Sequence, residues 1–502
     1  MEKYVLALDQ GTTSSRAVLF DKRLHKKAMA QREFPQHFPK LGWVEHNPMD
    51  IMRSLYSVIN EAVVKAGIRE EQIDSIGISN QRETVVVWER NTGKPVYNAI
   101  VWQCRRTAPL ADKLIAQGKG ELIREKTGLY PDAYFSGTKI KWILDNVAGV
   151  RERAEKGEIL AGTIDSWIIY NLSGKKAHVT DRTNASRTML YNIHTLEWDD
   201  ELLELLDIPR SMLPEVKDCS AIYAYTDKEV CGFCAPIASA VGDQQAALFG
   251  QCCFSEGETK VTYGTGCFLL MNTGENAVNS KHRLLTTIAL SMNGKVKYAL
   301  EGSIFMGGAL IKWLRDELGL ISSAKETDVL AESVADSGGV VVVPAFTGLG
   351  APYWDSYARG MIIGLTRGTT KAHICRAALE AIAFQVEDAL RCMQEDSSIR
   401  LPSIKVDGGA SVSDLLLQFQ ADMLNTSIYR PLNTESSVTG AAFLAGLATG
   451  FWQNREELKS VWSVEQVFTP GMDSAERDAK YNLWQRALNR SKAWLEQPEA
   501  VL

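Results

Sequence analysis

The sequence predicts an α/β protein built from two related halves. Strand-like apolar runs alternate with segments of helical periodicity along all 502 residues, which is typical of α/β architecture. A strand–turn–strand unit around a Gly/Thr/Ser turn occurs in residues 4–20 and again in residues 260–271. Because a repeated unit indicates an internal repeat, we expect two domains, residues 1–254 and 255–502. Two unrelated hairpins would give the same pattern, so self-similarity alone leaves that alternative open.

The two hairpins are predicted from short apolar runs that flank polar, glycine-containing turns. The four strands are Tyr4–Leu8, Arg16–Phe20, Lys260–Tyr263 and Phe268–Met271. The first turn, residues 9–15, begins with an aspartate and contains two threonines and two serines. The second turn, residues 264–267, repeats this composition in shorter form.

Helical periodicity marks further segments between and after the hairpins. The predicted helices are residues 50–65, 243–251, 372–393, 438–447 and 475–495. Residues 243–251 follow an apolar strand, 237–241, and start with an aspartate that we expect to cap the helix. Segment 438–447 is rich in Ala and Gly, so we expect its backbone to pack closely on a neighbour.

Composition and charge exclude several classes of protein. Hydrophobic residues are 45% and charged residues 23%, which excludes a disordered chain, a coiled coil and a collagen-like fibre. The net charge of −6 provides no general attraction to nucleic acid or anionic lipid, so we expect no nucleic-acid partner. The first apolar run ends at Asp9 and is too short for a signal peptide. No run approaches the ~20 apolar residues that span a bilayer, so we expect no stable membrane insertion.

The nine cysteines are expected to be reduced, because their number is odd and the chain is long. This predicts a cytoplasmic location. Cys231 and Cys234 have the spacing of a metal knuckle, but no second Cys or His pair stands at zinc-finger spacing. A structural role for this pair is therefore favoured over a metal or redox role.

Three polar turns are candidate phosphate-binding sites. The sequence contains no Walker-type phosphate loop, no His-Glu-x-x-His motif and no nucleophile elbow. Residues 11–14 and 264–266 supply backbone N–H groups and hydroxyls, which are donors that suit phosphate oxygens. A third turn, residues 407–410, follows a strand and precedes a helix. Each could be a plain turn, but three such turns after strands favour a phosphate site.

Four segments carry a shared pattern, Asp9–Arg16, Asn80–Thr84, Gly242–Gln245 and Tyr263–Phe268. They resemble the FGGY family of carbohydrate kinases and, within it, the kinases that act on glycerol. Two longer family patterns also match, residues 134–146, with Lys139 and Trp142 in place, and residues 360–380. The resemblance covers nearly the whole chain. It implies two RNase-H-like domains of the actin-like ATPase type that face an interdomain cleft, where ATP and glycerol meet.

The resemblance also implies a nucleotide site. Its residues would be Thr12, Thr13, Ser14, Arg16, Thr265, Gly308, Lys312, Gly409 and Ser413. The first four and Thr265 would contact the phosphates, and the others would line the adenosine side. Asp9 and Asp243 would hold Mg²⁺, which prefers carboxylate and phosphate oxygens and keeps much of its hydration shell.

For glycerol, the resemblance implies a second set of residues. They are Arg82, Glu83, Trp102, Tyr134, Asp243, Gln244 and Phe268. An arginine only donates hydrogen bonds and an ionised glutamate only accepts them, so Arg82 and Glu83 together suit hydroxyl groups. Trp102 and Phe268 would cover the C–H edge of the triol. The alternative for Arg82 and Glu83 is a surface ion pair, which is less expected between two apolar strands.

Asp243 is the implied general base for the terminal hydroxyl. Its alternative role is the N-cap of the helix, and the two roles are compatible. A carboxylate at a helix N-terminus is stabilised in its charged form, which would make it a weak base. Phosphoryl transfer tolerates a weak base because its loose transition state needs little early proton removal.

The chain departs from the family pattern at three places. Lys312 stands where Gln is usual and Ser413 where Asn is usual, and both positions lie on the implied adenosine side. Residues 225–235 lack the basic, glycine-rich loop with which some bacterial members bind fructose 1,6-bisphosphate. They also lack the histidine that other members phosphorylate.

The resemblance implies an ATP:glycerol 3-phosphotransferase that forms sn-glycerol 3-phosphate, as a homodimer or homotetramer. One alternative is an FGGY kinase that acts on a pentulose or another polyol. An alternative of a different class is an actin-like or chaperone-like nucleotide switch, which would have no use for a polar cup opposite the phosphates.

Overall fold

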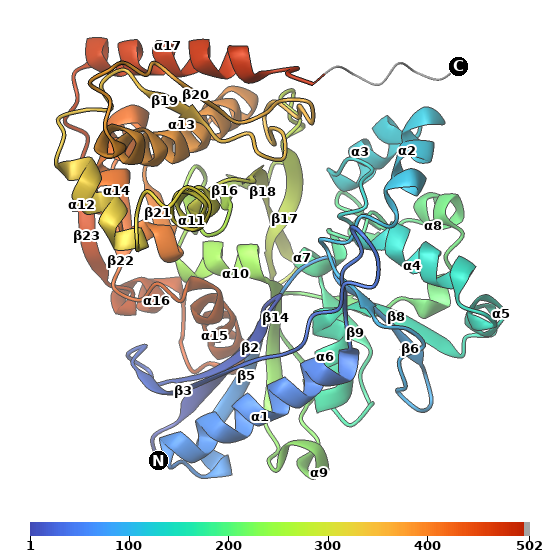
Figure 1. The fold of residues 1–502 in the computed structure, drawn as a ribbon. Helices are drawn as coiled ribbons and strands as arrows, with labels where there is room; N and C mark the ends of the chain where they lie inside the picture. The colour runs from blue at the N-terminus through green and yellow to red at the C-terminus, as the bar shows by residue number, and fades with distance from the viewer. Residues whose placement is uncertain (496–502) are drawn as a thin grey trace.

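Two large β-sheets organise the computed structural model, which describes residues 1–495 (Figure 1). The six-stranded sheet contains β1 (Tyr4–Gln10), β2 (Ser14–Phe20), β3 (Lys26–Glu33), β5 (Ile73–Asn80), β13 (Ser220–Tyr225) and β14 (Pro236–Gly242). The seven-stranded sheet contains β15 (Thr259–Tyr263), β16 (Cys267–Gly274), β17 (Leu285–Met292), β18 (Lys295–Ile304), β21 (Ile404–Asp407), β22 (Ile428–Pro431) and β23 (Val464–Phe468). Both predicted hairpins are present, as β1–β2 and β15–β16.

The two sheets share one strand plan. Their orders are β13-β14-β5-β1-β2-β3 and β17-β18-β16-β15-β21-β22-β23. In each sheet, the first hairpin strand pairs with a parallel strand, which has a second parallel neighbour and then an antiparallel edge strand. The repeated hairpin therefore belongs to a repeated sheet, and the α/β class is confirmed. The boundary at residue 255 stays a prediction.

Strand β1 shows why its sequence is almost uniformly apolar. Leu6 and Leu8 pack on the face of the sheet covered by α1 (Pro48–Ala66) and α6 (Ile164–Leu172). Val5 and Ala7 pack on the opposite face. A strand that is covered on both faces loses the polar alternation of a half-exposed strand.

The opposite face is covered by α10 (Asp243–Gly250) and α15 (Ser436–Thr449), which come from distant parts of the chain. Gly440 of α15 lies so close to α10 that an added Cβ would stand 1.9 Å from the carbonyl oxygen of Ala246. The Ala/Gly composition of this helix thus permits the close backbone packing that the sequence predicted.

The remaining strands and helices complete the fold. A smaller sheet of order β4-β7-β6-β8 lies beside the six-stranded sheet and consists of β4 (Glu45–His46), β7 (Ala99–Ile100), β6 (Val85–Glu89) and β8 (Ile159–Thr163). The two-stranded pairs are formed by β9 (Val179–Asp181), β12 (Glu215–Lys217), β10 (Tyr191–Asn192), β11 (Glu197–Trp198), β19 (Val341–Val343) and β20 (Met361–Ile363). The other helices are α2 (Ala108–Ala116), α3 (Gly120–Thr127), α4 (Ser136–Asn146), α5 (Val150–Glu155), α7 (Arg182–Ala185), α8 (Asp200–Leu206), α9 (Lys228–Cys231), α11 (Gly308–Asp316), α12 (Ala324–Glu332), α13 (Lys371–Ser397), α14 (Asp414–Leu424), α16 (Arg455–Val461) and α17 (Ser474–Ser491).

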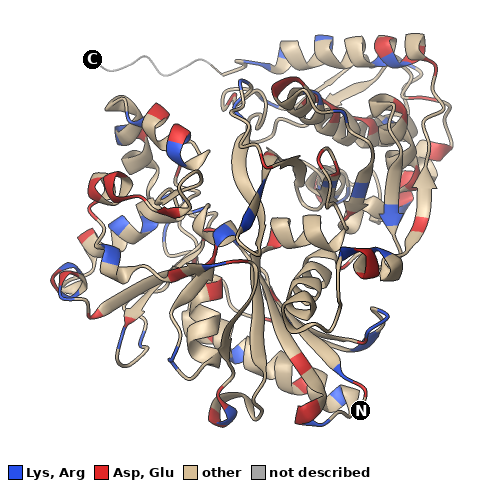
Figure 2. Ribbon diagram, turned by 180° about the vertical axis from the view of Figure 1, so that it is seen from behind, with Lys and Arg blue, Asp and Glu red and all other residues tan. Residues whose placement is uncertain are grey.

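Charged residues are spread over both halves of the molecule, and the described helices lack the hydropathy of membrane spans. Figure 2 shows acidic and basic residues interspersed over the helices and loops of both halves, in keeping with 55 basic and 61 acidic residues. Within residues 1–495, no helix combines the length and the hydrophobicity that crossing a bilayer requires.

The last helix ends earlier than predicted. Helix α17 stops at Ser491, whereas periodicity indicated a helix to Leu495. Lys492 is extended, and the backbone N–H of Ala493 donates to Asp355 at 2.8 Å. A tertiary hydrogen bond thus replaces the last helical turn, and Trp494 remains exposed.

Helix α17 is attached to α13 through a buried carboxylate. Asp388 accepts hydrogen bonds from the Tyr481 hydroxyl at 2.7 Å, the Trp484 indole at 2.8 Å and the Gln485 amide at 2.7 Å. Its neighbour Glu387 is also buried and accepts from Arg391 at 2.6 Å.

We expect Glu387 to make the stability of the protein depend on pH. Burial raises the pKa of this carboxyl to about 7 from its ordinary value of 4.5, although Arg391 opposes the shift. The folded chain therefore binds the proton more tightly, so this stabilising contribution is complete below pH 4.5 and is lost as the pH rises through about 7. Glu387→Gln should remove that loss. In thermal unfolding, the melting temperature of the variant relative to the parent should increase across this pH range. A constant difference would contradict the assignment.

Candidate active site

The turn between β1 and β2 presents the hydroxyls predicted to bind phosphate. The Gly11 N–H donates to the Ser14 carbonyl at 2.9 Å and closes the turn. Thr12 accepts a hydrogen bond from the indole N–H of Trp102 at 2.9 Å, so a predicted phosphate residue directly contacts a predicted polyol residue. Arg16, on β2, forms an ion pair with Glu435, which immediately precedes α15.

The other predicted nucleotide turns gather at one end of the seven-stranded sheet. The Gly308 N–H at the start of α11 donates to the Gly264 carbonyl at 2.8 Å. Gly408 has a φ of +88°, and an added Cβ would stand 2.6 Å from the carbonyl oxygen of Tyr263. The parallel pairing of Thr262 with Asp407 therefore brings the 264–266 and 407–410 turns together.

The two residues that depart from the family pattern have different surroundings. Lys312 is exposed on α11. Ser413 is buried, caps α14 by accepting from the Leu416 N–H at 3.1 Å, and donates to Asp328 of α12. Its hydroxyl is thus already engaged by the protein. Gly409 and Thr265 are exposed at their turns.

Arg82 and Glu83 lie in the turn between β5 and β6, and both are buried, which excludes the alternative of a surface ion pair. The Nη1 of Arg82 donates to Glu301 at 2.6 Å and its Nη2 to the other Glu301 oxygen at 2.9 Å. The Arg82 Nε lies 3.4 Å from Asp243. One guanidinium thus connects the predicted polyol site to the predicted base.

Arg82, Glu83 and Asp243 form an ion-pair cluster with Arg187 and Glu301. The sequence analysis did not predict the last two members. Arg187 donates to Glu83 at 2.6 Å and to Glu301 at 3.1 Å, and it is fully buried. Although burial opposes ionisation, Arg187 and Arg82 lower the pKa of Glu301 to about 2. A charged residue within the apolar strand 299–302 was the available signal for Glu301, whereas Arg187 lies in no recognisable motif.

The aromatic members of the predicted polyol site are only partly brought together. The rings of Trp102 and Tyr134 meet edge to face with centroids 5.7 Å apart. The Tyr134 hydroxyl lies 3.5 Å from Arg82. Phe268 lies on β16, and within the described residues it makes no aromatic contact with Trp102 or Tyr134.

Asp243 is the first residue of α10, not its cap. Gly242 occupies the N-cap position, and the Asp243 side chain accepts from the adjacent Gln244 N–H at 2.7 Å. The prediction of an aspartate cap was therefore off by one residue. Burial raises the pKa of Asp243 above its ordinary value, and Arg82 opposes the shift while Asp9 adds to it. The carboxylate is therefore a stronger base than a helix end alone suggested.

A buried lysine joins this group from the other half of the chain. Lys260 of β15 donates to the Gln244 side chain and to the Thr262 hydroxyl, the latter at 2.9 Å. Burial lowers its pKa to about 8 from an ordinary 10.5, although Asp407 and Asp243 favour the charged form.

Asp9 and Asp243 have the chemistry expected of a Mg²⁺ site. Burial raises the pKa of Asp9, and the Asp9 charge in turn helps to raise that of Asp243. Two such carboxylates attract a divalent cation, and Mg²⁺ completes its coordination with water and phosphate oxygens. Within the described residues, no cluster of three or more Asp, Glu, His or Cys side chains forms a metal site by itself.

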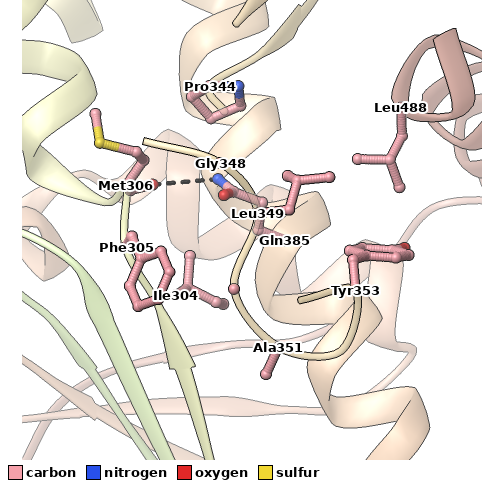
Figure 3. Close-up of a pocket in the computed structure, with 11 residues that line it drawn as sticks. Ile304, Phe305, Met306, Pro344, Gly348, Leu349, Ala351, Tyr353, Gln385 and Leu488 are labelled. Carbon is pink, nitrogen blue, oxygen red and sulfur yellow. Dashed lines mark hydrogen bonds between the residues drawn. The ribbon is translucent and has the colours of Figure 1, made fainter. Parts of the chain in front are cut away.

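The small cavity between the end of β18, α13 and α17 is not a competing site. The cavity in Figure 3 is lined mainly by apolar residues such as Phe305 and Leu349, and its volume of about 10 Å³ holds roughly a single water. The Gln385 amide donates to the Met306 carbonyl at 3.1 Å across it. A cavity of this volume is too small to bind a substrate.

Comparison with known proteins gives consistent matches over the whole chain. Two models of the FGGY family of carbohydrate kinases match, the N-terminal domain over residues 4–250 and the C-terminal domain over residues 259–449. The chain is 60% identical to glycerol kinase 2 of Thermotoga maritima, covering 98% of this chain and 99% of that protein. It is also 60% identical to a glycerol kinase of Alkaliphilus oremlandii, covering 99% of each. The crystal structure of Plasmodium falciparum glycerol kinase with ADP matches with a TM-score of 0.94 at 39% identity and covers 99% of each chain.

Proposed function

The chain belongs to the FGGY family of carbohydrate kinases, and on this premise we propose that it transfers the terminal phosphoryl group of ATP to glycerol. The products are ADP and sn-glycerol 3-phosphate. The observation that carries the proposal is the hydrogen bond of 2.9 Å between Trp102 and Thr12, because it joins the polyol residues to a phosphate-binding turn. Acceptor and phosphoryl donor would thus be adjacent.

The nucleotide occupies the turns of both sheets in this proposal. Thr12, Thr13, Ser14, Arg16 and Thr265 bind the phosphates through hydroxyl, N–H and guanidinium groups. Gly308, Lys312, Gly409 and Ser413 line the adenosine side. Arg16 exchanges its ion pair with Glu435 for a phosphate oxygen. Asp9 and Asp243 hold Mg²⁺, which neutralises phosphate charge when bound.

Glycerol binds among Arg82, Glu83, Trp102, Tyr134, Gln244 and Phe268. The Arg82 guanidinium donates to a hydroxyl and Glu83 accepts from one. Asp243 orients the terminal hydroxyl and takes its proton while the hydroxyl oxygen forms a bond to the γ-phosphorus. The bond from that phosphorus to the bridging oxygen breaks, and ADP leaves. Positioning and electrostatic stabilisation supply most of the acceleration.

A panel of acceptors tests the substrate. With Mg²⁺-ATP, we expect strong ADP production with glycerol and little with xylulose or ribulose, because Trp102 and Phe268 should leave no room for extra carbons. A coupled assay that measures ADP release for each acceptor gives kcat/KM. A five-carbon sugar that matches or exceeds glycerol would favour a pentulose kinase, and turnover independent of any acceptor would favour a nucleotide switch.

The proposal also covers the cellular compartment, the oligomeric state and the domain division of the enzyme. All nine cysteines are unpaired, which supports a reducing, cytoplasmic compartment. We propose a homodimer or homotetramer and a domain division near residue 255, with the polyol residues mainly on the N-terminal side and the adenosine residues on the C-terminal side.

A further inference from the structure

Lys139 is a buried lysine that the proposed mechanism does not use. It lies on α4 and is fully buried. Its ammonium group donates to three backbone carbonyls, those of Glu83 at 3.3 Å, Phe135 at 3.1 Å and Tyr134. An ammonium has three N–H donors, so its hydrogen-bonding capacity is filled by these backbone groups.

The carbonyl of Glu83 belongs to a strained turn. Glu83 has a φ of +61°, in the left-handed region that residues other than glycine rarely adopt. The Thr84 N–H donates back to the Arg82 carbonyl at 2.7 Å, which tightens the turn. Such conformations persist only where the surrounding structure holds them. The Ser136 hydroxyl, at 3.1 Å, and the Lys139 ammonium both hold the Glu83 carbonyl.

The charge on Lys139 is part of this arrangement. A neutral amine keeps only two N–H donors and turns a lone pair toward a carbonyl oxygen, so the three contacts need the ammonium form. Burial lowers the pKa of Lys139 to about 7 from its ordinary 10.5. The titratable and charged groups that face it are Glu83, Asp132 and the Cys104 thiol, which favour the ammonium, and Arg105, which opposes it.

We propose that Lys139 is a positioning residue that holds Glu83 and Tyr134, two members of the polyol site, at a fixed separation through their backbone carbonyls. The inference rests on the proposed function, since both residues are assigned to glycerol there. Lys139 itself does not touch the substrate. It acts by keeping the Glu83 carboxylate and the Tyr134 hydroxyl aimed at the same place.

The test is Lys139→Met, which keeps the length and removes the donors. We expect the KM for glycerol to rise by roughly 10–100-fold, the range typical when an outer partner that orients a binding group is lost. The KM for ATP should stay within about twofold.

Lys405→Met is the matched control, since Lys405 is also buried and donates to a backbone carbonyl, that of Cys252 at 3.0 Å. It should cost stability without changing the KM for glycerol. A folded Lys139→Met with the parental KM would overturn the proposal.

A second variant covers the case in which Lys139→Met does not fold. Lys139→Arg keeps the charge, but a planar fork does not place three donors as an ammonium does, so the same rise in KM is expected. A parental KM for glycerol in Lys139→Arg would also overturn the proposal.

The pH dependence separates positioning from general packing. In the parent, the KM for glycerol should rise as the pH passes through about 7, where the ammonium is lost, and this rise should be absent in Lys139→Arg. A rise that persists in the variant would assign it to another group and contradict the role of the ammonium. The proposed function is tested independently, because its failure is the absence of glycerol-dependent ADP release in the parent itself.

Discussion

Asp243→Asn is expected to lower kcat by ~10²–10⁴-fold, the usual loss when a positioned general base is removed. Asparagine is nearly isosteric but does not accept the hydroxyl proton. Gly242, not Asp243, caps α10, and within the helix the Asp243 side chain accepts only from the adjacent N–H, so the helix loses little. Its other partner, Arg82 at 3.4 Å, keeps Glu301 as an ion-pair partner. The melting temperature should therefore change little. Steady-state kinetics with glycerol and Mg²⁺-ATP measure kcat, and the KM for ATP should change far less.

The matched control is Asp200→Asn. Asp200 is also the first residue of a helix, α8, and pairs with Arg210 at 2.5 Å on the surface. The Asp200→Asn substitution removes the same charge at the same helical position and lies outside the proposed site, so kcat should stay at the parental value. If Asp243→Asn folds normally and keeps kcat within about tenfold of the parent, below the general-base range, Asp243 is structural and the base lies elsewhere.

The parts of the site that the sequence predicted are those carried by contiguous segments. The turn at residues 11–14 follows directly from two apolar runs and the hydroxyl residues between them, because a hairpin is a local structure. Its counterpart at 264–266 has the same pattern, and the structure places each turn at the equivalent strand of its sheet. Local patterns therefore predicted both hairpin turns and the internal repeat, while the binding of phosphate at these turns stays a prediction.

The parts that were missed depend on pairing between distant residues. Arg187 contacts Glu83 across 104 positions and Glu301 across 114 positions. The residues next to Arg187 in the sequence are Ser186 and Thr188, a pattern typical of a surface loop. Only the folded chain shows that the charge is buried and matched, since burying an unpaired charge is too costly. Lys139 matched a family pattern, but its role escaped prediction for the same reason, because its partners are backbone carbonyls and leave no signal in residue types.

Errors of one to four residues arose where local propensity competed with tertiary contacts. Asp243 resembles an N-cap, but the backbone of Gly242 takes that position and leaves the carboxylate directed toward Arg82. Helix α17 has the periodicity to continue, but the N–H of Ala493 bonds to Asp355 instead. In both places the sequence pattern predicted a helix correctly. A contact with a distant residue accompanies the difference in where the helix begins or ends.

Glu301 joins the ion-pair cluster from β18 of the seven-stranded sheet, and its position gives the second large prediction. Both of its carboxylate oxygens are bonded, one to Arg82 at 2.6 Å and the other to Arg82 at 2.9 Å and Arg187 at 3.1 Å. The side chains of Arg82 and Glu301 are only 2% and 0% exposed. Water therefore does not replace the carboxylate when it is lost.

The matched pair for comparison is Glu45 and Arg106. They are also buried and lie 2.6 Å apart, but their other partners are Tyr97, Asn98 and Cys104 rather than residues of the ion-pair cluster. Glu45→Gln should lower the melting temperature, because it too breaks a buried ion pair. Its KM for glycerol should remain parental.

We expect Glu301→Gln to raise the KM for glycerol by roughly 10²-fold, since removing one partner of a buried ion pair costs ~2–5 kcal/mol. Glutamine keeps the shape but removes the charge and turns an amide donor toward two guanidinium groups. Arg82 would then turn toward Glu83 or Asp243 and lose its orientation toward the polyol. The KM for ATP should change little, because the phosphate turns are not part of the cluster. If folded Glu301→Gln loses stability as Glu45→Gln does but keeps the parental KM for glycerol, the cluster serves the fold alone.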